Sequence, residues 1–168
     1  PARDRSEEIV INGKIQFQAR QQLSRAALAL QNGVLYLAYS SYNNQEPTHG
    51  WLFAYDASTL EQSGVYVTTP NSSSGTIWMS GGGPAIDADE NVYFSTGNGD
   101  PRTSVEYDTE NKDDSVIKLS LDLVHGGLSL QDFFMPFNRW LLVAGVPQEP
   151  AKPTYPGDVD LGAGGVML

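Results

Sequence analysis

The chain has 168 residues, of which 20 are acidic and 10 are basic, so its formal net charge is −10, and it contains no cysteine. Without cysteine there are no disulfides, thiolate nucleophiles or cysteine–zinc sites. The acidic balance would repel a phosphate backbone and no basic stripe offsets it, so we expect no nucleic-acid partner. No apolar run approaches the ~20 residues that a membrane-spanning helix requires, so we expect no membrane span either.

The first repeating unit is predicted over residues 23–69. It opens with a β-hairpin over residues 28–38, in which two apolar runs flank Asn32-Gly33, a pair that favours the tight turn of a hairpin. Two more strands of this unit are predicted at residues 51–56 and 65–69. Residues 8–18, which precede the unit, are expected to form the outer strand of an earlier one.

The same design returns in residues 78–135. Its hairpin has short alternating runs on either side of Asp89-Glu90-Asn91, whose residue types favour a left-handed turn position. This turn lies 58 residues after the Asn32-Gly33 turn, and self-similarity at a fixed spacing indicates a repeat architecture. The strands predicted for the whole unit are residues 85–87, 92–95, 115–120 and 130–134.

The end of the chain contains a proline-rich segment and the beginning of a third unit. Residues 136–157 hold five of the ten prolines, so an extended surface excursion with little regular structure is predicted there. Residues 158–168 are predicted to start the next unit, because Gly164-Gly165 echoes Gly82-Gly83 at the start of the second. Two full units are therefore expected between two partial ones.

Tandem four-stranded antiparallel units are the construction of a β-propeller, in which each unit is a blade set radially about a channel. The predicted fold is all-β: a fragment of a single propeller domain over residues 1–168, with about two full blades and partial ones beside them. A closed propeller needs at least four blades, so we expect the chain to be a piece of a longer protein. Such a piece would expose unpaired strand edges, and we predict a homo-oligomer that light scattering would detect.

The surplus of acidic residues is concentrated between Asp100 and Asp114. A solvated loop is the interpretation we favour, with binding of a divalent cation as the alternative. A second acidic stretch, residues 87–91, resembles the start of a calcium loop, but Val92 stands where such a loop requires glycine. A hairpin turn is therefore predicted at that position.

Several motifs resemble those of the PQQ-like (pyrroloquinoline quinone-like) β-propeller repeat proteins, over nearly all of the sequence. They are HGWLFAYD at 49–56 with STL at 58–60, GGGPAIDA at 81–88, VYFSTGNG at 92–99 and DLGAGG at 160–165. The stretch from Trp78 to Asn98, followed by Asp100-Pro101, resembles a segment of the PQQ-dependent alcohol dehydrogenases, in which a tryptophan precedes a hairpin that ends in T-G-N-P. The resemblance implies a quinoprotein-like propeller.

In those dehydrogenases a planar ortho-quinone stacks on a tryptophan, and a calcium ion held by asparagine and acidic side chains polarises it to accept hydride from an alcohol. The resemblance implies that Trp78 is the cofactor-binding floor and that Asn98 binds in the cofactor site as an oxygen ligand of the metal. An indole offers a large flat face, and a hard cation prefers amide or carboxylate oxygen. Two structural alternatives stay open: Trp78 as core between blades, and Asn98 as a left-handed turn residue.

The catalytic base of the dehydrogenases has no direct counterpart in this chain. Where those enzymes have P-H-D-x-W-D, residues 136–141 are PFNRWL, so Asn138 replaces the aspartate. An amide cannot take up a proton in the usable range, so alcohol oxidation by the family mechanism lacks its base. Asp158 and Asp160 are candidate replacements, and the catalytic residues are otherwise unassigned.

Two other functions remain open. One is a non-catalytic propeller that serves as a scaffold or as a ligand- or protein-binding platform, similar to the PQQ-like lipoproteins of outer-membrane assembly. The other is a carbohydrate-binding propeller, in which Trp51, Trp140 and the tyrosines stack on sugars. By analogy with these relatives alone, we expect a bacterial, exported protein that is periplasmic or extracellular.

Overall fold

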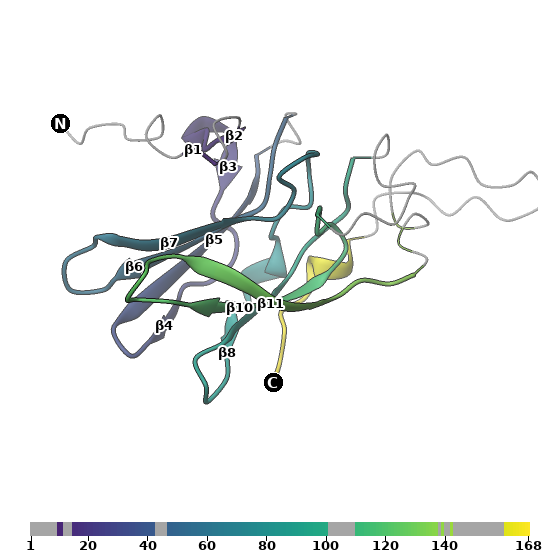
Figure 1. The fold of residues 1–168 in the computed structure, drawn as a ribbon. Coiled ribbons are helices and arrows are strands. Elements are labelled where there is room, and N and C mark those ends of the chain that lie inside the picture. Colours follow the sequence, from purple (N-terminus) through teal and green to yellow (C-terminus); the bar gives the residue numbers. More distant parts are fainter. Residues whose placement is uncertain are drawn as a thin grey trace, which may run out of the picture.

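A computed structural model describes residues 10–11, 15–42, 47–100, 110–137, 139, 142 and 160–168 of the chain. Within these residues the regular structure consists of β-strands and short 3-10 turns, and no α-helix occurs (Figure 1). The strands gather into a two-stranded sheet and two larger ones, in which every pair of neighbours is antiparallel. The all-β prediction is therefore confirmed.

The first large sheet lies within the predicted unit at residues 23–69. Its strands are β3 (Gln22–Leu23), β4 (Ala29–Gln31), β5 (Val34–Ser41), β6 (Trp51–Asp56) and β7 (Gln62–Val67). The order is β3-β5-β6-β7, with β4 also paired to β5. Side chains along β5 alternate between buried and half-buried, as the period of two predicts. The outer strand β7 begins three residues earlier than the predicted 65–69.

The second large sheet lies within the predicted unit at residues 78–135. Its strands are β8 (Ala85–Ile86), β9 (Val92–Ser95), β10 (Val116–Leu121) and β11 (Leu128–Phe134), preceded by the 3-10 turn η3 (Met79–Gly81). The order is β11-β10-β9-β8, so consecutive strands are neighbours throughout. This is the four-stranded up-and-down sheet of a propeller blade.

The two hairpin turns predicted 58 residues apart meet in space. The Asn32 side-chain amide donates a hydrogen bond to the Glu90 carboxylate, across a separation of 58 residues. Both residues have positive φ, 46° for Asn32 and 65° for Glu90. In the second turn the Asp87 carboxylate accepts the backbone N–H groups of Asp89 and Asn91, at 3.0 and 2.8 Å. Asp87 therefore closes a hairpin turn, which confirms that prediction over a calcium loop.

A single apolar core joins the facing surfaces of the two blades. The first blade contributes Val34, Tyr36, Ala38, Leu52 and Ala54, and the second contributes Val92, Phe94, Ile117 and Leu119. The Tyr66 and Phe94 rings meet edge to face across the boundary, with centroids 6.3 Å apart. Burial of apolar side chains from both sheets holds the blades together.

A second apolar cluster covers the opposite face of the first blade. Ile15 and Phe17 pack there against Trp51, Phe53 and Val67. Residues 8–18, expected to form one outer strand, instead contain β1 (Val10–Ile11) paired with β2 (Ile15–Gln16). Trp51 has no exposed surface and lies parallel to Phe53, with centroids 5.9 Å apart. Sugar stacking on Trp51 is therefore wrong, while Trp140 lies outside the described residues.

The starts of three successive units lie side by side. The Ala27 N–H donates to the Gly82 carbonyl at 3.1 Å. A Cβ on Gly82 would lie 3.1 Å from the Cα of Gly165, so a larger residue would push the two segments slightly apart. Residues 160–168 contain the 3-10 turn η5 (Leu161–Ala163) and no strand, and most of the predicted excursion at 136–157 lies outside the described residues. The similar glycine pairs Gly82-Gly83 and Gly164-Gly165 thus lie where the backbones of neighbouring units are in contact.

Candidate functional site

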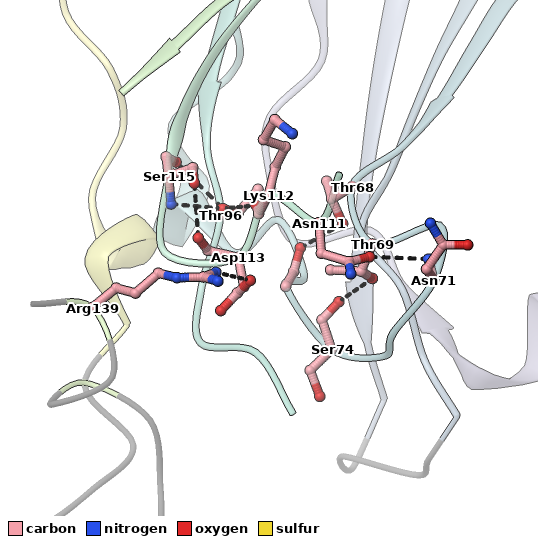
Figure 2. Close-up of polar contacts among 11 residues, drawn as sticks. Thr68, Thr69, Asn71, Ser74, Thr96, Asn111, Lys112, Asp113, Ser115 and Arg139 are labelled. Atoms are coloured by element: carbon pink, nitrogen blue, oxygen red, sulfur yellow. Dashed lines mark hydrogen bonds and ion pairs between the residues drawn. The ribbon is translucent and has the colours of Figure 1, made fainter. Parts of the chain in front are cut away.

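Buried polar side chains gather in the loops at one end of the two blades (Figure 2). At most 7% of the surface is exposed in each of Thr68, Thr69, Ser73, Thr76, Thr96, Asp100, Asn111, Lys112, Asp113, Asp114, Ser115 and Arg139. The acidic run at 100–114 was predicted to be solvated, and for Asp100, Asp113 and Asp114 this prediction is wrong, whereas residues 101–109 lie outside the description. The loops that follow the strands fold inward, so their polar groups need partners within the protein.

Hydrogen bonds from the end of β9 fix these loops. The Thr96 hydroxyl donates to the Lys112 carbonyl at 2.6 Å and accepts the Ser115 N–H at 3.0 Å. The next residue, Gly97, donates its N–H to the Thr76 carbonyl at 2.8 Å and accepts the Asp114 N–H at 2.8 Å. Gly97 is therefore held between the loop from the first blade and the loop that precedes β10.

Trp78 and Asp160 both approach the backbone at Gly97-Asn98. The Asp160 carboxylate accepts the backbone N–H of Asn98 at 3.0 Å. A Cβ placed on Gly97 would lie 2.2 Å from Asp160 Oδ1 and 3.2 Å from Trp78 Cδ1. The structure thus places the Trp78 ring and one of the two candidate replacement bases beside the backbone that carries Asn98. Asn138 and Asp158 lie outside the described residues.

A cation covers the indole of Trp78. The guanidinium carbon of Arg25 lies 5.2 Å from the ring centroid, within the range of a cation–π interaction. Trp78 is half-buried and immediately precedes η3, whereas Arg25 is exposed and precedes β4. No local pattern pointed to Arg25, because its contact with Trp78 depends on how the two units pack.

A buried ion pair lies in the loops at this end of the blades. The Arg139 guanidinium binds the Asp113 carboxylate, and each side chain is 3% exposed (Figure 2). Burial gives this pair a low-dielectric environment, in which either charge alone is costly. Arg139 therefore anchors the segment after β11 to the loop before β10.

The neighbouring carboxylate, Asp114, has no exposed surface. Its Oδ1 accepts the Leu161 N–H at 3.2 Å, whereas its Oδ2 has no hydrogen-bond partner within the described part of the chain. Burial, followed by the carboxylates of Asp113 and Asp160, raises the pKa of Asp114 to about 7, and the Leu161 N–H and Arg139 oppose the rise. Asp114 thus carries a buried oxygen that is able to bind a proton or a cation.

Within the residues that the structure describes, no cluster of three or more histidine, cysteine or acidic side chains has metal-binding geometry. An oxygen site built from the described residues would therefore combine at most two carboxylates with amide, backbone or water oxygens. Such mixed oxygen sets suit calcium, whose coordination is flexible. In the same part of the chain no helix is long and apolar enough to cross a membrane.

Comparison with protein-family models and with curated proteins gave no match. The structure is similar to that of a quinohemoprotein alcohol dehydrogenase from Pseudomonas putida, with a TM-score of 0.51 and 17% sequence identity. The similarity covers 72% of this chain and 21% of the enzyme, so the chain spans about a fifth of that protein. The fold is that of a β-propeller. This confirms the fold expected from the PQQ-like motifs.

Proposed function

We propose that this propeller segment binds PQQ together with a calcium ion at the loop end of the blades. Trp78 provides the flat surface for the ring system, and Asn98 provides an oxygen ligand for the metal. The observation that supports this assignment is the position of the Trp78 ring beside Gly97, the residue before Asn98, where Asp160 also accepts the Asn98 backbone N–H at 3.0 Å. The shared propeller fold adds support at the level of architecture alone.

The residues around Trp78 suit the chemistry of the cofactor. PQQ is a planar ortho-quinone with three carboxylates, and Arg25, 5.2 Å from the indole centroid, places positive charge beside the stacking surface. The oxygens of Asn98, Asp114 and Asp160 are the type that a hard cation prefers. The buried Oδ2 of Asp114 has no hydrogen-bond partner among the described residues, so the site has an oxygen able to face a cation. When bound with calcium, such a quinone supplies a hydride acceptor.

The proposal separates cofactor binding from alcohol oxidation. An asparagine at position 138 supplies no proton acceptor. Asp160 is the described carboxylate next to Asn98, and its contact with the Asn98 N–H holds it at the site. If the protein oxidises an alcohol, Asp160 takes the proton that the substrate hydroxyl releases. Dehydrogenase activity with an artificial electron acceptor, lost in Asp160→Asn at calcium and PQQ concentrations that saturate the variant, is the measurement that assigns this role.

Titration with PQQ tests the proposed function. We expect a saturable change in PQQ absorbance and quenching of tryptophan fluorescence in the presence of calcium, and weaker binding when calcium is chelated. Trp78→Ala and Asn98→Ala should each weaken binding by about tenfold or more, because one removes the stacking surface and the other a metal ligand. Tyr42→Ala and Asn71→Ala change exposed residues of similar type and serve as controls. Absence of a saturable spectral change would contradict the proposal.

A scaffold or partner-binding platform is the second candidate, and the outer strand β11 favours it. This strand is hydrogen-bonded on one side to β10 and ends its sheet. Leu130 and Phe134 on it are 39% and 63% exposed. An unpaired edge with apolar side chains is a template for pairing with another strand.

Self-association through β11 gives a direct prediction. We expect light scattering to report a mass above that of the monomer, and Leu130→Lys to shift the mass toward the monomer because a charge blocks edge pairing. Leu123→Lys is the matched control, since Leu123 is 65% exposed in the turn before β11 rather than on the edge. A monomeric mass for the unmodified chain, or equal effects of both variants, would exclude this contact.

The location of the protein follows the same resemblance. We propose that it acts in the periplasm or outside the cell, where the PQQ-like relatives act. Fractionation of the cells that produce it, followed by detection with an antibody against this chain, would test the location. Recovery in the cytoplasmic fraction would contradict the proposal.

A further inference from the structure

The Asp114 carboxylate differs from the other buried carboxylates in the loops at this end of the blades. Its neighbour Asp113 binds Arg139, and the nearby Asp100 accepts the Ser73 hydroxyl at 3.3 Å. Asp114 is completely buried, yet among the residues that the structure describes its Oδ2 has no hydrogen-bond partner. A buried, unpartnered carboxylate oxygen is costly, and such atoms in native proteins call for a specific explanation, such as a bound ion.

The backbone holds this carboxylate toward residues 160–161. The Asp114 N–H donates to the Gly97 carbonyl at 2.8 Å, and Asp114 has a left-handed φ of 42°. Its Oδ1 then accepts the Leu161 N–H at 3.2 Å. The carboxylate therefore faces the segment that carries Asp160, although Asp114 and Asp160 are far apart in the sequence.

Asp160 lies against the same stretch of backbone. Its Oδ1 lies 3.0 Å from the Asn98 nitrogen and so close to Gly97 that a Cβ there would be 2.2 Å away. Gly97 accepts the Asp114 backbone N–H on its carbonyl, and Asp114 Oδ1 accepts the N–H of Leu161, the residue after Asp160. The two aspartates are thus both held to residues 97–98 and 160–161, and the Arg139 guanidinium binds the neighbouring Asp113.

We propose that Asp114 and Asp160 together hold a divalent cation, with calcium as the preferred ion. The donors are carboxylate oxygens, which hard cations prefer over the softer metals that select histidine or cysteine. A cation between the carboxylates supplies the missing partner of Asp114 Oδ2 and offsets the charge that burial makes unfavourable. This inference deepens the proposed function by naming carboxylate ligands for its metal, but the ion binds without the quinone.

Calcium alone, without PQQ, tests the site. By calorimetry on the metal-free chain we expect one calcium to bind, and terbium to replace it with emission sensitised by the nearby Trp78. Asp114→Asn and Asp160→Asn should each weaken calcium binding by about 10- to 100-fold. Asp132→Asn, an exposed aspartate on β11, should leave the affinity unchanged. Trp78→Phe should dim terbium emission while calorimetric affinity for calcium stays the same.

The outcomes separate this inference from the proposed function. Calcium binding that depends on Asp114 and Asp160 supports the site even if PQQ does not bind. Absence of calcium binding, or equal affinity in the unmodified chain and in Asp114→Asn, would overturn it, even if PQQ binds. Because Asp114→Asn keeps the shape of the side chain and removes a buried charge, we expect the variant to fold, and circular dichroism checks this. Asp114→Glu, which keeps the charge, should retain more affinity than Asp114→Asn.

Discussion

Arg139→Ala is expected to lower the free energy of unfolding by about 3–5 kcal/mol. Its guanidinium binds Asp113, and both side chains are 3% exposed. The substitution leaves the Asp113 carboxylate buried without its counter-charge, which costs far more than the loss of a surface ion pair. Urea denaturation followed by tryptophan fluorescence measures the change. Arg20→Ala is the matched control, because Arg20 is exposed in η2 (Ala19–Gln21), and its effect should stay within about 0.5 kcal/mol.

A second substitution identifies the cause of the loss. Asp113→Asn introduced into Arg139→Ala removes the orphaned charge, so the double variant should be more stable than Arg139→Ala alone. The two effects would then be non-additive, as expected for residues in contact. If the losses simply add, Arg139 acts through packing and not through its charge. If Arg139→Ala behaves like Arg20→Ala, the ion pair makes no contribution.

The hairpins and their repeat could be predicted from the sequence because the residue types in and beside each turn determine them. Asn32-Gly33 supplies a turn that tolerates positive φ, and Asp87 supplies side-chain acceptors for its own turn. Alternation along β5 fixes which side chains enter the core. These signals extend over a few residues, so the predicted hairpin positions agree with the structure. The boundary of β7 and the hairpin β1–β2 depend on packing against distant residues and were missed.

Part of the candidate site could be predicted from the sequence. The motif from Trp78 to Asn98 indicated two residues, and the structure places the Trp78 ring beside Gly97, the residue before Asn98. Asp160 and Asn98 are 62 residues apart in the sequence. Their contact could not be predicted, so the sequence alone did not show which of Asp158 and Asp160 is the better candidate for the catalytic base. Burial of Asp114 and the approach of Arg25 to Trp78 depend on how separate units pack. Without knowledge of this packing, a run of acidic residues predicts a solvated loop.

Metal-free protein should lose stability as the pH rises, and Asp114 should carry much of this loss. Burial, then the carboxylates of Asp113 and Asp160, raise the pKa of Asp114 to about 7 from an ordinary value of 3.8. Below the ordinary value the group is protonated in both the folded and the unfolded chain. As the pH rises between the two values, the unfolded chain releases the proton first, so unfolding becomes more favourable. The expected loss is on the order of 2–4 kcal/mol between pH 4 and pH 8.

Comparison of variants isolates this contribution from the rest of the titration. Other carboxylates act with the opposite sign, since hydrogen bonds from Ser58 and Thr59 lower the pKa of Asp56 to about 2, and that stability is lost as the pH falls. We therefore expect denaturation in EDTA to show a smaller decline with pH for Asp114→Asn than for the unmodified chain or Asp132→Asn. Parallel pH profiles for all three would show that Asp114 ionises as freely in the folded chain as in the unfolded one. Because the amide cannot ionise, Asp114→Asn should also be the more stable protein at pH 8, and calcium should narrow that difference by stabilising the unmodified chain alone.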